Sequence, residues 1–170
     1  GSIYEFEYYK AKDFELFPDG VSPTDDSILS FATADWIMHG GEVWKYYVTY
    51  ASKYECPVGG YGGRFTRYVA KARRDGFGTP YDSCGNGSAM RISPVGWAFN
   101  TKEEVLAKAK ESAECTHNLP EGIKGAQAKA LAILMARMGA SKDEIKTTIE
   151  SEFGYNLNFT IDELRPAYTS

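Results

Sequence analysis

The sequence predicts an all-α fold in a single domain spanning residues 1–170. Three capping boxes are predicted, each with a Ser or Thr at the N-cap and a Glu three residues later, so that each side chain can satisfy the other residue's backbone amide at a helix N-terminus. Apolar residues recur at helical spacing along the chain. Alternating strand-like runs are scarce, and the aromatic-rich segment before Asp19 is the one irregular candidate. With 43% apolar residues, a chain of this length can bury one core.

The first half of the chain is expected to hold three helices. The first begins near Thr24 and ends at Gly40-Gly41, because paired glycines interrupt helices readily. The second spans residues 44–54. A glycine-rich turn at residues 59–63 then leads into a basic helical stretch that ends near Arg74.

The second half is expected to be helical throughout. The capping boxes are Thr101 with Glu104, Ser141 with Glu144, and Thr160 with Glu163. An apolar stripe follows each of the first two boxes. The first stripe consists of Val105, Leu106, Ala109 and Ala113, and the second of Ile145, Ile149 and Phe153. Between them, the segment from Glu121 to Met138 is rich in Ala, Ile and Leu and stops at Gly139, a typical residue just past a helix C-terminus. We predict that this segment is a buried central helix.

Composition excludes some classes of partner. The formal net charge is -4, from 19 basic and 23 acidic side chains, so no broad basic surface for nucleic acid or an anionic membrane is expected. Three widely spaced cysteines, Cys56, Cys84 and Cys115, favour reduced thiols over disulfides or zinc. The longest apolar stretch, at residues 130–136, is too short to span a bilayer, and no signal-peptide pattern opens the chain. A cytoplasmic location is therefore expected.

The segment Pro23-Thr24-Asp25-Asp26-Ser27 lies at the start of a predicted helix and has two interpretations. Thr is a favoured N-cap, and acidic residues in the first turn interact well with the helix dipole. Alternatively, the hydroxyl and the two carboxylates supply hard oxygen ligands of the kind that Mg²⁺ prefers.

The segment from Ser83 to Arg91 is a glycine-rich turn that opens into an apolar stretch. Glycines permit close backbone approach, and amides exposed at such a turn can hold a phosphate. A plain turn is the alternative, since Asn-Gly is a common turn dipeptide.

His117 lies where one predicted helix ends and Pro120 helps to start the next. A single histidine is more often a structural residue than a catalytic one. Its two ring nitrogens and its pKa nevertheless suit it to binding phosphate or ribose.

Four segments taken together resemble the ADP-ribosylglycohydrolase family in order and spacing. They are GSIYEF at 1–6, PTDDS at 23–27, GNGSAMRISPVGW at 85–97 and THNLPEGIKGAQA at 116–128. The resemblance implies a compact all-α protein with orthogonally packed helices that binds two divalent ions, Mg²⁺ or Mn²⁺. It also implies cleavage of ADP-ribose from arginine or serine side chains of a protein substrate or from small conjugates.

The resemblance also assigns roles to residues of this chain. Thr24, Asp25 and Asp26 match half of the family's metal site, and Glu5 matches a glutamate on a loop near the metals, so that Glu5, Asp25 and Asp26 are the catalytic candidates. The substrate-binding candidates are Ser83, Gly85, Asn86, Gly87, Ser88, Met90, His117 and, as a weaker companion, Asn118.

The chain departs from the family pattern in three respects. The Gly-Asp of the family's first helix and its C-terminal Asp-x-Asp-Thr motif, the other half of the metal site, are not found in these 170 residues. We therefore expect the 170 residues to be a fragment of a longer domain, with a missing segment or a second chain completing the site. Leu119 replaces a second histidine, and Cys84 replaces an aromatic residue, which weakens the case for adenine stacking at that position.

Three functional hypotheses follow. The first is a metal-dependent hydrolase acting on an ADP-ribose conjugate. The second is a non-catalytic module that binds ADP-ribose or a related nucleotide without turnover. The third is a helical interaction domain in which Thr24 is only a cap and residues 85–88 only a turn.

Overall fold

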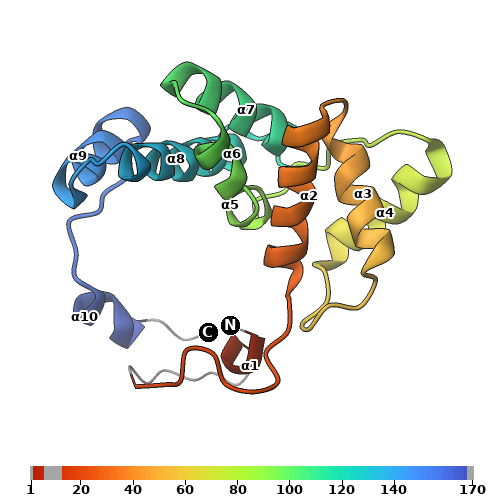
Figure 1. Cartoon of the computed structure of the whole chain (residues 1–170), viewed down its shortest axis with the longest axis horizontal. Coiled ribbons are helices and arrows are strands. Elements are labelled where there is room, and N and C mark those ends of the chain that lie inside the picture. The colour runs from red at the N-terminus through yellow and green to blue at the C-terminus, as the bar shows by residue number, and fades with distance from the viewer. Residues whose placement is uncertain (1, 6–12, 168–170) are drawn as a thin grey trace.

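The computed structural model describes residues 2–5 and 13–167, and this part of the chain is helical without strands (Figure 1), as the sequence predicts. The helices are α1 (Ser2–Glu5), α2 (Asp25–His39), α3 (Val43–Lys53), α4 (Gly63–Asp75), α5 (Gly87–Met90), α6 (Ser93–Ala98), α7 (Lys102–Glu114), α8 (Pro120–Arg137), α9 (Lys142–Phe153), α10 (Ile161–Leu164) and a 3₁₀ turn, η1 (Arg165–Ala167).

Helix α8 is the centre of the packing, which confirms the prediction of a buried central helix. It contacts α5, α6, α7 and α9. Its small residues allow this close surrounding, since Ala126 and Ala130 are fully buried and Leu131 and Leu134 nearly so. Burial of one such helix by four neighbours supplies much of the hydrophobic stabilisation of the fold.

Helices α2, α3 and α4 form the other part of the molecule (Figure 1). Helix α2 packs on α3 and α6, and α3 packs on α4 and α7, so α2 and α3 connect this part to the helices around α8. Trp36 of α2 and Tyr47 of α3 are buried in the same core as Ile92 and Val105. The two halves of the sequence therefore share one core.

The helix boundaries agree with the sequence signals to within a residue or two. Helix α2 ends at Gly40, whose φ of 73° suits glycine. The capping boxes at Ser141 and Thr160 are both complete. At Thr101 only half of the box forms: the Thr101 hydroxyl accepts from the Glu104 amide at 3.3 Å and donates to the Glu104 carboxylate at 2.8 Å. The segment before Asp19 forms no strand in its described residues, 13–18.

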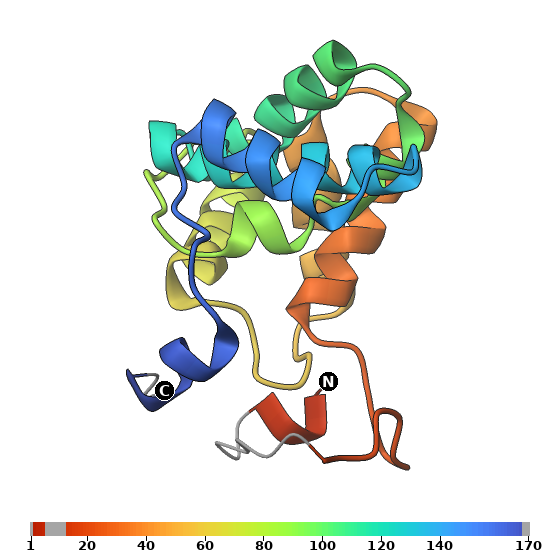
Figure 2. The same cartoon turned by 90° about the vertical axis from the view of Figure 1, so that its left-hand side faces the viewer.

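Helices α1 and α10 lie at one end of the molecule, below the other helices in both views (Figures 1 and 2). Across the described residues, no helix combines the length and apolar character needed to cross a bilayer.

Candidate active site

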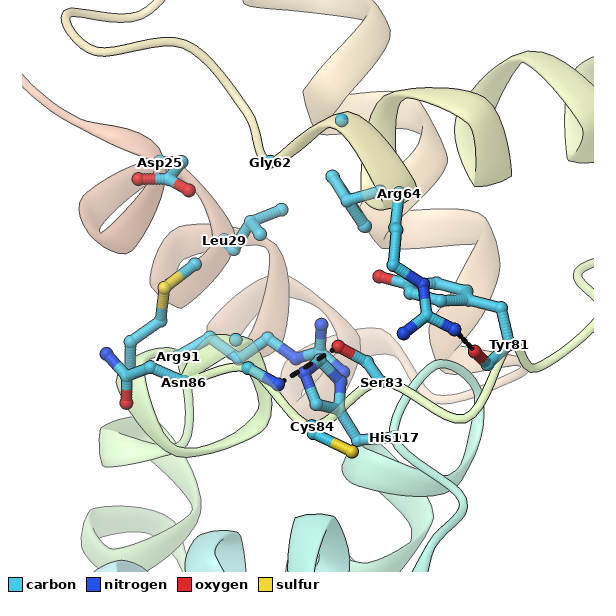
Figure 3. Close-up of a pocket in the computed structure, with 15 residues that line it drawn as sticks. Asp25, Leu29, Gly62, Arg64, Tyr81, Ser83, Cys84, Asn86, Arg91 and His117 are labelled. Atoms are coloured by element: carbon cyan, nitrogen blue, oxygen red, sulfur yellow. Dashed lines mark hydrogen bonds between the residues drawn. The ribbon is translucent and has the colours of Figure 1, made fainter.

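One cavity of about 450 Å³ is lined by residues from four separate parts of the chain. The start of α2, the start of α4, the glycine-rich segment before α5 and the turn between α7 and α8 line it (Figure 3). Its lining residues are Asp25, Leu29, Gly62, Gly63, Arg64, Phe65, Tyr81, Ser83, Cys84, Gly85, Asn86, Gly87, Met90, Arg91 and His117.

The glycine-rich segment is held in place by hydrogen bonds at its start. The Ser83 hydroxyl accepts from the amide of Gly85 at 3.3 Å, and the Ser83 amide donates to the carbonyl of Thr116 at 3.3 Å. The side chain of Asn118 accepts from the amide of Asp82 at 2.9 Å. The loop is therefore fixed against the turn between α7 and α8.

Gly87 approaches the ring of His117 so closely that a larger residue would not fit. A Cβ at position 87 would lie 2.9 Å from Cε1 of His117. Glycine at position 87 therefore lets the backbone pack directly against the His117 ring.

His117 is buried, with 3% of its surface exposed, and its Nδ1 lies 2.8 Å from Oγ1 of Thr116. The pKa of His117 is lowered from 6.5 to about 4, mainly by burial and to a smaller extent by the nearby Arg91 and Arg64, and a hydrogen bond with the backbone of Gly85 offsets part of the effect. His117 is therefore neutral at pH 7 and acts as a hydrogen-bonding group without charge.

Arg91 is the most buried charged residue of the site, with 1% of its surface exposed. Its Nη2 donates to the Ser112 carbonyl at 2.7 Å and to Thr116 Oγ1 at 2.8 Å, and its guanidinium lies 3.9 Å from the centre of the Tyr47 ring. Within residues 2–5 and 13–167 it forms no ion pair, and its buried Nε has no hydrogen-bond partner. A buried cation without a counter-ion is costly, so an anion in the cavity would compensate it.

Arg64 is a second cation at the cavity, on the opposite side from Asp25 (Figure 3). Its guanidinium donates to the backbone carbonyls of Tyr81 and Asp82 and lies 5.2 Å from the centre of the Tyr81 ring. Arg64 stands in the first turn of α4, where the helix dipole disfavours positive charge. Its position thus adds to the positive potential at this end of the cavity.

Thr24, Asp25 and Asp26 form the acidic end of the site. Thr24 is in the N-cap position of α2, but its side chain makes no capping hydrogen bond, so the purely structural interpretation of this residue is not supported. Asp25 lines the cavity and Asp26 is exposed beside it. A hydroxyl and two carboxylates fit one Mg²⁺ or Mn²⁺ completed by water.

A site for two metal ions requires more ligands than these three residues provide. In the described part of the chain, no cluster of three or more His, Cys, Asp or Glu side chains could hold a metal ion. The metal-binding role of Thr24, Asp25 and Asp26 therefore stays a prediction.

Seven of the candidates predicted from the sequence line the same cavity: Asp25, Ser83, Gly85, Asn86, Gly87, Met90 and His117. Thr24 and Asp26 flank Asp25 without lining it, and Asn118 supports the loop from outside. Ser88 is buried and donates to the Gly122 carbonyl at 2.7 Å. Glu5 ends α1, and its side chain lies outside the described residues.

Sequence reasoning missed Arg64, Tyr81 and Arg91. A basic residue in the first turn of α4, against the preference of the helix dipole, was a signal for Arg64. Arg91 is the one charged residue in the apolar segment from Ser88 to Val95, which was a second signal.

Comparison with known proteins gives a consistent result. A family model described as ADP-ribosylglycohydrolase matches residues 1–168. ADP-ribosylhydrolase ARH3 of Mus musculus is 37% identical over 75 residues, which cover 44% of this chain and 19% of the relative. The Homo sapiens and Bos taurus proteins of the same name are also 37% identical over 75 residues, covering 44% of this chain and 20% of each relative. The aligned segment spans about a fifth of these relatives' length.

Proposed function

The chain belongs to the ADP-ribosylglycohydrolase family, and on this premise we propose that it acts in the metal-dependent hydrolysis of the N- or O-glycosidic bond of ADP-ribose attached to protein side chains or small conjugates. The observation that carries the proposal is the cavity itself. It has a carboxylate, Asp25, on the side opposite the cation Arg64, and the second cation, Arg91, and the glycine-rich loop also line it (Figure 3).

This charge distribution fits the two ends of an ADP-ribose conjugate. The diphosphate carries negative charge, which Arg64 and Arg91 attract and to which backbone amides of the glycine-rich loop can donate. The ribose that bears the scissile bond has no negative charge and lies towards Asp25. The same cavity can therefore hold the anion and present the glycosidic bond to a carboxylate.

The residues at the acidic end suit the chemistry of glycosidic cleavage. Departure of the leaving group builds positive charge on the anomeric carbon, and the Asp25 carboxylate is suited to stabilise that charge. Mg²⁺ or Mn²⁺ held by Thr24, Asp25 and Asp26 would orient ribose hydroxyls and lower the pKa of water. Glu5 is proposed to position or deprotonate the attacking water.

A second candidate function is ADP-ribose binding without turnover. It is favoured by the absence, among the described residues, of a cluster of three or more His, Cys, Asp or Glu side chains that could hold a metal ion. Under this alternative the cationic end and His117 bind the nucleotide, and no bond is cleaved.

Thermal melting and product release together test the proposal. The chain is melted with Mg²⁺ or Mn²⁺, with ADP-ribose, and with both, while release of free ADP-ribose from a modified-arginine or modified-serine peptide is measured in parallel. We expect stabilisation by ligand, because any molecule that binds only the native state raises the melting temperature. Stabilisation without release would favour the binding module, and no shift with any ligand would contradict both functions.

The metal site is tested by two matched substitutions in first helical turns. Asp26→Asn in α2 is expected to abolish the shift in melting temperature produced by Mn²⁺. Asp143→Asn in the first turn of α9, which is exposed and does not line the cavity, is expected to leave that shift unchanged. An intact metal response in the Asp26 variant would remove this residue from the proposed site.

A further inference from the structure

A chain of buried hydrogen bonds connects the cavity to the protein core through Thr116. Nη2 of Arg91 donates to Thr116 Oγ1 at 2.8 Å, and the same oxygen lies 2.8 Å from Nδ1 of His117. Thr116 is fully buried and Arg91 almost so. The ring of His117 is thus the end of a polar connection that begins at a buried cation.

The geometry favours one direction for the Thr116 hydroxyl. Arg91 can only donate, so Oγ1 accepts from it and has a single proton to give. That proton can go to Nδ1 of His117 at 2.8 Å or to the Ala113 carbonyl at 3.4 Å, and the shorter contact is the better bond. Donation from the cationic guanidinium also polarises the hydroxyl and makes it a stronger donor.

Close packing restricts the orientation of the His117 ring. A Cβ built at Gly87 would lie 2.9 Å from the ring atom Cε1 of His117, and one built at Gly122 would lie 2.9 Å from its Cβ, so backbone packs closely against both the ring and the base of the side chain. The charged groups that act on it are Arg91 and Arg64, and both oppose a second proton on the ring. The Tyr81 ring lies 6.3 Å away, centre to centre.

We propose that Thr116 is a positioning residue: its hydroxyl, held by Arg91, donates to Nδ1 of His117 and thereby keeps the single ring proton on Nε2, on the side of Gly87 and the glycine-rich loop. A neutral histidine with a fixed proton presents a donor of defined position to the glycine-rich loop, where the backbone of Gly85 hydrogen-bonds with the ring. The tautomer is thus set by a residue that does not line the cavity. The consequence for ligand affinity rests on the proposed function, whereas the tautomer does not.

Nitrogen NMR of the His117 side chain tests the tautomer in the ligand-free chain. In the unmodified protein and in Thr116→Ser, which keeps the hydroxyl, we expect Nδ1 to resonate as an unprotonated acceptor and Nε2 as a protonated nitrogen. In Thr116→Val, which keeps the shape but removes the donor, we expect both frequencies to move towards each other as the two tautomers exchange.

Affinity for ADP-ribose is the second measurement, made by calorimetry on the same three proteins. Loss of one buried hydrogen bond is expected to weaken binding about tenfold in Thr116→Val. The Thr116→Ser variant is expected to bind within about threefold of the unmodified protein, because serine offers the same hydroxyl.

The outcomes separate the two proposals. A proton on Nδ1 in the unmodified protein, or unchanged frequencies in the valine variant, would overturn the role of Thr116 even if ADP-ribose binds. The expected tautomer without any binding of ADP-ribose would support the role of Thr116 and contradict the proposed function. If Thr116→Val does not fold, Thr116→Ala, which also lacks the hydroxyl, takes its place in both measurements.

Discussion

At the scale of single residues, the site is defined by cations that lack a carboxylate partner. Arg91 is buried among a carbonyl, a hydroxyl and an aromatic ring, and Arg64 is held by two carbonyls. Neither forms an ion pair with a described residue. Both therefore retain positive charge for a ligand, whereas His117 between the loops is neutral.

Replacing Arg64 by Ala should weaken ADP-ribose binding selectively. The guanidinium offers charge-assisted hydrogen bonds to the diphosphate, so we expect a loss of about tenfold in affinity. Affinity for adenosine, which carries no phosphate, is expected to change little. Isothermal titration of both ligands measures the difference.

Arg67 provides the control, because it is also exposed on α4 but does not line the cavity. Arg67→Ala should bind both ligands as the unmodified protein does. An equal loss for adenosine and ADP-ribose in the Arg64 variant would mean that Arg64 shapes the cavity and does not bind phosphate.

Acid should destabilise the protein partly through His117. Its pKa is about 4 in the folded state and 6.5 in a flexible chain, so the unfolded state takes up a proton first as pH falls. The stability is complete above pH 6.5 and is lost between 6.5 and about 4. This difference corresponds to at most roughly 3 kcal/mol, and we expect about 2 kcal/mol because the ring borders a solvent-accessible cavity.

Urea unfolding at several pH values measures this effect, with His117→Gln as the comparison. The unmodified protein should lose about 2 kcal/mol more than the variant between pH 6.5 and 4. Parallel pH profiles for the two proteins would show that His117 is not held neutral by the fold.

At the scale of the helices, α6 and α8 meet with almost no space between them. A Cβ at Gly96 would lie 2.7 Å from Cβ of Ile133 and 2.8 Å from the Ala130 carbonyl oxygen. This close approach holds α6 against the central helix α8. In the chain, α6 follows the glycine-rich loop and α5. Packing of this pair therefore supports the wall of the cavity.

Gly96→Ala should be destabilising although alanine has the higher helix propensity. The added methyl group overlaps backbone and a β-branched side chain, and overpacking of this kind costs about 1–3 kcal/mol. Gly125 of α8 is the matched control, because the nearest neighbour of its added Cβ is Tyr155 Oη at 3.9 Å. Gly125→Ala is expected to gain up to about 1 kcal/mol.

Denaturant melts of both glycine variants give the two free energies of unfolding. Opposite signs would support the close contact of α6 and α8. A gain in stability for both would mean that the helices can separate to admit a methyl group.

At the scale of the whole molecule, one buried polar contact links three helices that are distant in sequence. The Tyr47 hydroxyl of α3 lies 3.0 Å from Thr33 Oγ1 of α2 and 2.6 Å from Ser112 Oγ of α7. Burial raises the pKa of Tyr47, so the phenol stays protonated. Its ring also faces the guanidinium of Arg91, which connects this contact to the cavity.

Removing this hydroxyl should lower global stability. Tyr47→Phe leaves the buried Ser112 hydroxyl without its tyrosine partner, and an unsatisfied buried group costs about 1–3 kcal/mol. Tyr46→Phe removes a comparable hydroxyl that donates to the Gly40 carbonyl in a solvent-accessible position, so a loss below about 1 kcal/mol is expected. Thermal and urea unfolding measure both losses. Equal losses of stability in the Tyr47 and Tyr46 variants would contradict the proposed importance of the buried Tyr47 hydroxyl.

The sequence by itself determined the helices and most of the candidate residues. Capping boxes, glycine stops and apolar periodicity act within a few residues of the chain, so Ser141, Thr160 and the segment that became α8 could be assigned without tertiary information. The glycine-rich loop and His117 were recognised because their spacing resembles a family that residues 1–168 match.

Only the tertiary structure decided which of these residues act together. Asp25, Arg64 and His117 are far apart in sequence and line one cavity because α2, α4 and the turn after α7 are packed around a shared core. The same packing made Ser88 a buried support and Arg91 a buried cation. Local sequence cannot reveal such roles, since the burial and the neighbours that define them arise only when distant segments fold against each other.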